Sequence, residues 1–285
     1  MQLRVGFDLQ FSCPKPTELI MMLSLHPSQG SRLLSNDALT VSPALPVRSY
    51  IDSFGNRAHR LTAPAGPIRF QSDFLVQGDD SPDVLPVDAV QHPIADLPDD
   101  VLIFLLASRY CEVEKLSPMA WQQFGALPDG WPRVQAILDF VHGHIRFDYN
   151  CARGDRSAHD ALTDGEGVCR DFAHLSVALC RAMHIPARYV TGWLGDIRWP
   201  RVPGPMDFSG WTQVWLGGRW WDVDARHVTP RHGRVLMAGG RDAADVAIST
   251  AFGAATVPRV HVISDEVDPP AEWLGSNHET VPFAA

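Results

Sequence analysis

Residues 165–175 read Gly165-Glu166-Gly167-Val168-Cys169-Arg170-Asp171-Phe172-Ala173-His174-Leu175. The two glycines indicate a turn that needs unusual backbone angles or a close approach of another segment. Beyond them, apolar residues recur at helical spacing until Ile185-Pro186, where the proline ends the run. The pattern predicts a largely buried helix whose first turn carries Cys169.

Cys169 is the first candidate for a chemical role. The free backbone N–H groups of a first helical turn and the positive end of the helix dipole favour a thiolate, the nucleophilic form of cysteine. A free cysteine more often serves as a small apolar side chain, and Cys180, among apolar neighbours on the same helix, fits that role. The glycine turn and the helix start set Cys169 apart, so we predict a nucleophile there.

The composition narrows the classes of partner. The chain has 285 residues, of which 45% are hydrophobic and 20% charged, and this suits one large globular domain or two smaller ones. A net charge of −9 without a basic patch argues against nucleic acid or an anionic membrane as the partner. No run is long enough to span a membrane, and the first residues lack the pattern of a signal peptide.

The cysteines and histidines suggest neither disulfides nor a metal site. Five widely spaced cysteines without a Cys-x-x-Cys pair indicate reduced thiols and a cytoplasmic location. The close pair His142 and His144 diverges on a helix, and no acidic loop has the spacing of a calcium site. We therefore expect no metal and no cofactor; the sequence leaves the oligomeric state open.

The hydrophobic pattern divides the chain into four parts. Alternating and short apolar runs between turn signals predict an all-β domain over residues 1–80, of the sandwich or barrel type. Acidic residues and prolines indicate a linker over residues 81–98. Residues 99–267 are expected to form a core of helices packed on an antiparallel sheet, and residues 268–285 a polar tail. The predicted fold class is α+β.

Within the core, the pattern predicts helices first and a hairpin later. Helices are expected over residues 101–110 and 117–124 and from Pro132 onward, and strands over residues 188–194, 210–216, 219–225 and 259–263. Gly217-Gly218 is a two-residue hairpin turn, which places Trp215 opposite Trp220 and Trp211 opposite Asp224.

This order of motifs resembles the bacterial transglutaminase-like superfamily over roughly residues 135–230. The resemblance is carried by Gly167-Val168-Cys169-Arg170-Asp171-Phe172-Ala173-His174-Leu175, by Ile185-Pro186-Ala187-Arg188-Tyr189-Val190 and by Trp211…Val214…Gly217-Gly218-Arg219-Trp220…Asp224. It implies a papain-like core, accompanied in bacterial members by a β-rich N-terminal region. It also implies that cysteine, histidine and aspartate cooperate in acyl transfer, with Cys169 matching the nucleophile and Asp224 the acid that orients the histidine.

The family histidine has no counterpart here. Ser209 stands at its position, two residues before Trp211, and a serine is no general base near neutral pH. This departure puts hydrolase activity in question.

Three other histidines are candidate substitutes. His227 follows Asp224 by three residues, so a regular strand would turn it to the opposite face, whereas a bulge or strand end at Ala225-Arg226 would reverse that. His232 can fold back from the following loop. His174 points away from Cys169 on the helix and is expected to be packed.

The sequence therefore predicts a transglutaminase-like cysteine enzyme that acts on amide or peptide bonds through a thioester at Cys169. Asp224 and His227 are the expected orienting acid and base, and a protein or peptide is the expected substrate. The alternative is a non-catalytic peptide- or protein-binding module, because of Ser209. A third reading is a scaffold whose β domain binds a partner.

Overall fold

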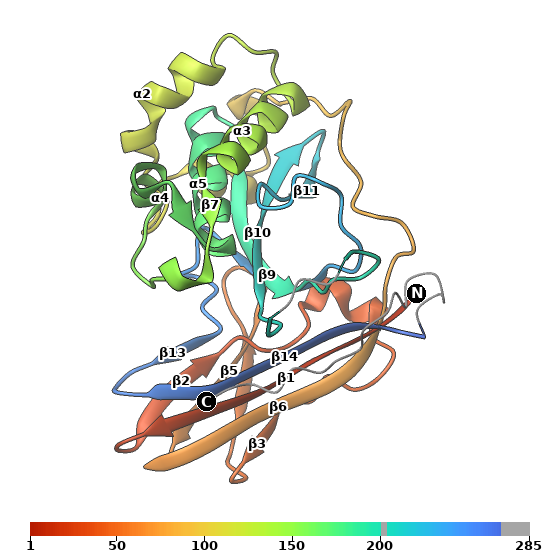
Figure 1. The fold of residues 1–285 in the computed structure, drawn as a ribbon, viewed down its shortest axis with the longest axis vertical. Helices are drawn as coiled ribbons and strands as arrows, with labels where there is room; N and C mark the ends of the chain where they lie inside the picture. Colours follow the sequence, from red (N-terminus) through yellow and green to blue (C-terminus); the bar gives the residue numbers. More distant parts are fainter. Residues whose placement is uncertain (201–203, 269–285) are drawn as a thin grey trace.

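The computed structural model describes residues 1–200 and 204–268 as a β-sandwich packed against a helical layer on a second sheet (Figure 1). Helices gather at the top of the view and the sandwich lies below them. The predicted α+β class is confirmed. The polar tail expected at 268–285 lies outside the described residues apart from Asp268.

The sandwich is built from two antiparallel sheets, with strand orders β14-β1-β6-β3 and β13-β2-β5-β4. Alternation along the first strand buries every second side chain in the space between the sheets, namely Leu3, Val5, Phe7, Leu9 and Phe11. A short 3-10 helix, η1 (Pro27–Arg32), follows the second strand. The strands are β1 (Gln2–Cys13), β2 (Thr17–Met21), β3 (Thr40–Ser42), β4 (Arg48–Ile51), β5 (Arg57–Ala63), β6 (Gly66–Gln77), β13 (Ser249–Ala251) and β14 (Thr256–Val267).

The last two strands correct the predicted domain division. The core was expected to extend to residue 267, but β14 pairs with β1 along its length and β13 pairs with β2. The chain thus returns to the N-terminal sheets after completing the core. The reason is that β1, paired on one side with β6, would otherwise expose a second edge of unpaired N–H and C=O groups. Such long-range pairing leaves no local sign in the sequence.

The second part is a four-stranded antiparallel sheet, of order β11-β10-β9-β12, covered on one face by helices. Helix α5 (Cys169–Ala182) is the central element and packs on β9 and β10 and against α2, α3 and α4. The others are α1 (Asp99–Leu102), α2 (Val113–Phe124), α3 (Trp131–His144), α4 (Ala158–Asp164), β9 (Ala187–Trp193), β10 (Ser209–Leu216), β11 (Arg219–Val223) and β12 (Val235–Gly240), with the short pieces η2 (Ile94–Asp96), η3 (Ile103–Leu105), η4 (Tyr149–Cys151), β7 (Arg146–Phe147) and β8 (Glu166–Gly167).

The hairpin follows the predicted register, with Trp215 opposite Trp220 and Leu216 opposite Arg219. Several helix limits differ from the prediction. The helix expected over 101–110 is only α1 and η3, and α2 begins at Val113 and carries Pro118 in its interior. Helix α4 and strand β12 were not predicted.

The predicted linker is held along the core by backbone hydrogen bonds. Asp83 donates to the Arg231 carbonyl, Trp131 donates to the Ala89 carbonyl, and Gly217 donates to the Val90 carbonyl. The segment is thus an ordered connection that runs beside the hairpin. Within residues 1–200 and 204–268, no helix has the length and apolar character needed to cross a membrane.

Trp193 joins the two parts. It belongs to β9 of the core sheet, yet its ring is fully buried in the sandwich cluster, edge-on to Phe74 at 5.6 Å and to Phe208 at 5.8 Å. Its Nε1–H donates to the Gly6 carbonyl at 3.1 Å. The two parts therefore share a hydrophobic cluster, within which Trp193 also forms a hydrogen bond between them.

We expect Trp193→Ala to lower the free energy of unfolding by about 3–5 kcal/mol, because it leaves a cavity and removes the bond to Gly6. Trp121→Ala is the matched control, since that ring is 46% exposed, and should change stability by about 0.5 kcal/mol or less. Urea titrations measure both. Equal midpoints for the two variants would contradict the role given to Trp193.

Candidate functional site

A buried carboxylate holds the turn that precedes Cys169. Asp171 Oδ2 accepts the Val168 backbone N–H at 2.9 Å and an Nη1–H of Arg156 at 3.2 Å. A Cβ on Gly167 would overlap this carboxylate, so glycine is required there. Helix α5 consequently begins at Cys169, where the sequence predicts its first turn.

Cys169 is half-buried, and burial raises the pKa of its thiol. The Gly210 backbone N–H donates to the sulfur and, with the charge of Arg226, acts in the opposite direction. The carboxylates of Asp207 and Asp224 add to the rise. Burial therefore opposes the thiolate that the N-terminal amides of α5 were expected to favour.

Asp224 is the first residue after β11, and a turn begins at its side chain. Its Oδ1 accepts the Arg226 backbone N–H at 2.9 Å, and its carbonyl accepts the Val228 N–H at 2.9 Å. Its Oδ2 accepts from His227 Nδ1 at 2.9 Å and from Arg234 Nη2 at 3.0 Å. Burial alone would raise the pKa of Asp224, but Arg234 and His227 hold it well below its usual value.

The strand end explains the position of His227. Because β11 stops at Val223, the residues after it no longer alternate between faces, and the turn carries the His227 ring back onto Asp224. His142 of α3 supports the turn through a 2.9 Å contact between its Nδ1 and the Ala225 carbonyl. The strand thus ends at Val223, before the Ala225-Arg226 position considered in the sequence, and Ala225-Arg226 lie in the turn.

Ser209 is buried at the start of β10, paired with Gly192 of β9. Its neighbour Gly210 supplies the N–H that reaches the Cys169 sulfur. A Cβ on Gly210 would overlap the Tyr189 hydroxyl, so this close approach also requires glycine.

The structure thus brings Asp224 and His227 into contact and places Asp224 near enough for its charge to act on Cys169. In the described part of the chain, no hydrogen bond joins the Cys169 sulfur to a histidine ring. His174 is buried between Tyr110 and Tyr189, and burial lowers its pKa well below the usual value. Its Nε2 accepts the Ala243 N–H at 3.1 Å, as expected of a packed histidine.

Two arginines make contacts in the candidate site that the sequence did not predict. Arg234 binds Asp224 from the position just before β12, a strand that the sequence did not reveal, and its charge at the start of the run Arg234-Val235-Leu236-Met237 was the one available sign. Arg226 lies over the Phe147 ring at 3.9 Å and donates to the Tyr149 hydroxyl. Among residues 1–200 and 204–268, no group of three or more His, Cys, Asp or Glu side chains is arranged to hold a metal ion.

The raised thiol pKa leads to a test on Cys169. Its alkylation by iodoacetamide at pH 7 should be slower than that of a free cysteine, because less of the sulfur is thiolate, and the rate should still climb above about pH 9. Peptide mapping by mass spectrometry gives the rate at each pH, and Cys151→Ser removes the other cysteine that is not fully buried. A rate that levels off below about pH 8.5 would contradict the raised pKa.

Comparisons with known proteins bear on the family and the fold. Residues 120–225 match the transglutaminase-like superfamily. A crystal structure from Cytophaga hutchinsonii, described as a "Putative Cysteine Protease", is 29% identical, covers 100% of this chain and 94% of its own, and superposes with a TM-score of 0.80.

Curated relatives match over a shorter region. An uncharacterized protein of Mycobacterium leprae is 40% identical over 123 residues, which are 41% of this chain and 43% of the relative. One of Mycobacterium tuberculosis is 32% identical over 128 residues, 40% of each. The match spans about two fifths of the length of these relatives. Residues 120–225, which include α5 and the β10–β11 hairpin, therefore match the transglutaminase-like superfamily, and the whole chain is similar to the Cytophaga hutchinsonii structure.

Proposed function

We propose that this chain is a cysteine enzyme that cleaves or transfers amide bonds through a thioester at Cys169. His227 is the general base and Asp224 orients it. The observation that carries the proposal is the 2.9 Å contact between Asp224 Oδ2 and His227 Nδ1. A carboxylate held on Nδ1 fixes the ring and leaves Nε2 to take up a proton.

The reaction needs a base because the thiol is neutral near pH 7. In the proposed sequence, His227 Nε2 takes the thiol proton as the Cys169 sulfur attacks the amide carbonyl, which gives a tetrahedral oxyanion. The carbon–nitrogen bond then breaks, and the leaving amine takes the proton from His227. Water hydrolyses the resulting thioester, or a second amine accepts the acyl group.

The surroundings of the sulfur fit a developing negative charge. The first-turn N–H groups of α5, the Gly210 N–H and the Arg226 guanidinium all lower the energy of an anion at Cys169. The Tyr149 hydroxyl, bound to Arg226, is a candidate donor to the oxyanion. A protein or peptide substrate and a cytoplasmic location complete the proposal; all five cysteines are free thiols, in keeping with a reducing compartment.

A reaction with a general acyl donor tests whether His227 acts as the general base. The wild type should release p-nitrophenolate from p-nitrophenyl acetate and form an acetylated Cys169, visible in the intact mass, and Cys169→Ala should abolish both. His227→Gln should lower the acylation rate by about 10²–10⁴-fold. His232→Gln is the matched control and should keep the wild-type rate. Equal rates for His227→Gln and the wild type would remove His227 from the proposal.

A second candidate function is a peptide-binding module without catalysis. It is favoured by Ser209 at the position of the family histidine and by the lack of a sulfur–histidine hydrogen bond in the described residues. In that case the wild type should not acylate at Cys169, while Ser209→His should acquire acylation that Ser209→His with Cys169→Ala loses. Urea titrations of the Ser209→His variant establish that it folds. Acylation of the wild type that depends on His227 would reject this candidate.

A further inference from the structure

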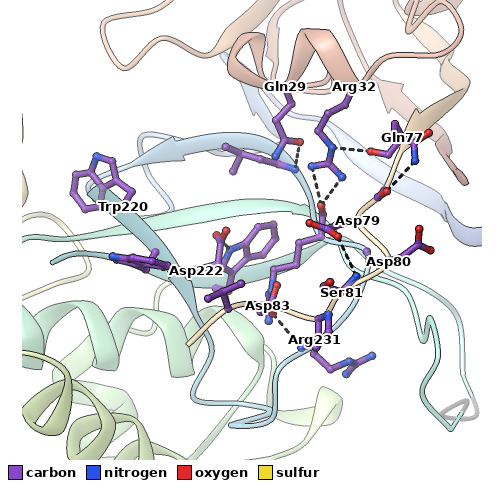
Figure 2. A pocket seen from close by; sticks show the side chains of 18 of the residues that line it. Gln29, Arg32, Gln77, Asp79, Asp80, Ser81, Asp83, Trp220, Asp222 and Arg231 are labelled. Atoms are coloured by element: carbon purple, nitrogen blue, oxygen red, sulfur yellow. Dashed lines mark hydrogen bonds and ion pairs between the residues drawn. The ribbon is translucent and has the colours of Figure 1, made fainter. Parts of the chain in front are cut away.

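A cavity of about 550 Å³ lies between the sandwich and the core sheet, away from the thiol. Figure 2 shows Gln29 and Arg32 entering it from η1, and Trp220 and Asp222 from the hairpin. We name it the strap cavity, because residues 79–84 run along its open side. Its volume falls within the roughly 300–1,000 Å³ of ordinary ligand sites.

The strap cavity is on the opposite face of the sheet from Cys169. On β10, Thr212 points toward α5, where its hydroxyl donates to the Ala173 carbonyl at 3.3 Å. Its neighbours Trp211 and Gln213 point the other way, and Gln213 lies opposite Asp222. Trp211 and Asp222 line the cavity. It is therefore a separate site from the one proposed for acyl transfer.

The wall of the cavity carries equal numbers of arginine and aspartate side chains, and half of these residues already form ion pairs. Asp83 binds Arg234 at 2.6 Å, Arg231 binds Asp196 at 3.2 Å, and Asp80 binds the chain's amino terminus at 2.9 Å. In the described part of the chain, two cations and two anions of the wall have no ion-pair partner. They are Arg32, Arg219, Asp79 and Asp222.

Arg32 and Asp222 are the best-positioned of these charges. Within the described residues, Arg32 donates to carbonyl oxygens alone, those of Gln77 at 2.8 Å and of Arg234 at 3.3 Å. Burial lowers the pKa of Arg32, while the charges of Asp79 and Asp222 raise it, so these groups face a common space. A guanidinium without a carboxylate is a ready partner for one.

The carboxylate of Asp222 is oriented by hydrogen bonds and has no ion pair within the described residues, although the charges of Arg32, Arg188 and Arg234 act on it. Its Oδ1 accepts from Trp211 Nε1 at 2.6 Å and from Gln213 Nε2 at 2.8 Å, which leaves Oδ2 for a ligand cation. One more donor is unused: Arg234 Nη1 has no hydrogen-bond partner in the described residues, although that side chain is only 6% exposed. A buried donor without a partner costs free energy that a bound ligand can recover.

We propose that the strap cavity binds a zwitterion, a free amino acid or a short peptide, with its carboxylate on Arg32 and its ammonium group on Asp222. Equal numbers of unpaired cations and anions suit a ligand that carries both signs better than a simple anion or cation. The Trp211 and Trp220 rings supply the apolar wall for the part between the two ends.

Isothermal titration calorimetry on the Cys169→Ala protein tests this, because that variant cannot consume a peptide. Glycine and glycylglycine are the two zwitterionic probes and separate an amino acid from a peptide as the ligand. N-acetylglycine lacks the cation and glycinamide lacks the anion, so each should bind at least about tenfold more weakly than glycine.

Two substitutions test which side chain binds each charged end of the ligand. Arg32→Gln should weaken the better zwitterion at least about tenfold but leave glycinamide unchanged, and Asp222→Asn should do the same while leaving N-acetylglycine unchanged. Asparagine keeps the oxygen that Trp211 and Gln213 use, so Asp222→Asn preserves the hairpin. Arg109→Gln and Asp139→Asn, both exposed and outside the cavity, are the matched controls.

Lack of binding by both zwitterions at millimolar concentration would overturn the proposal, as would equal affinities in Arg32→Gln, Asp222→Asn and the controls. Because the assay uses Cys169→Ala and measures binding alone, its result is independent of whether Cys169 and His227 carry out acyl transfer.

Discussion

The buried Arg234 guanidinium is the interaction on which the arrangement of the site depends. It lies between two carboxylates, Asp83 at 2.6 Å and Asp224 at 3.0 Å, and its side chain is almost fully excluded from water. Burial of one charge without its partners would be costly, so the three groups stabilise one another only when all are in place. Because Asp83 belongs to the connecting segment and Asp224 to the end of the hairpin, one ion network joins the connection, the residue before β12 and the candidate base.

Asp224 has two functions that follow from that network. Arg234 keeps it ionised, and an ionised carboxylate is the stronger partner for the His227 ring. Its other oxygen forms the turn that brings His227 back toward it. The hairpin end is thus a structural cap and also positions the ring that we propose as the general base.

The beginning of α5 illustrates a competition between two electrostatic effects. Free amide groups at a helix N-terminus stabilise an anion, whereas exclusion of water destabilises it, and burial raises the pKa of the Cys169 thiol. Proximity to Asp207 and Asp224 acts in the same direction as burial. In the proposed mechanism, such a thiol needs a base at the moment of attack, so the position of a histidine matters more than it would beside a preformed thiolate.

Local pattern determined much of this protein. The helical period after Cys169, the alternation of β1 and the Gly217-Gly218 turn are contained in a few neighbouring residues each, so α5, the first strand and the hairpin register followed from the sequence. The match between Cys169, Asp224 and the transglutaminase-like pattern also needed only order and spacing. What the tertiary structure decided is the orientation of His227, the pairing of Arg234 with Asp224, the return of β14 to β1, the raised pKa of Cys169 and the charges of the strap cavity. Each of these depends on contacts between residues far apart in the chain or on the exclusion of water. The spacing of neighbouring residues specifies neither the contacts nor the exclusion of water.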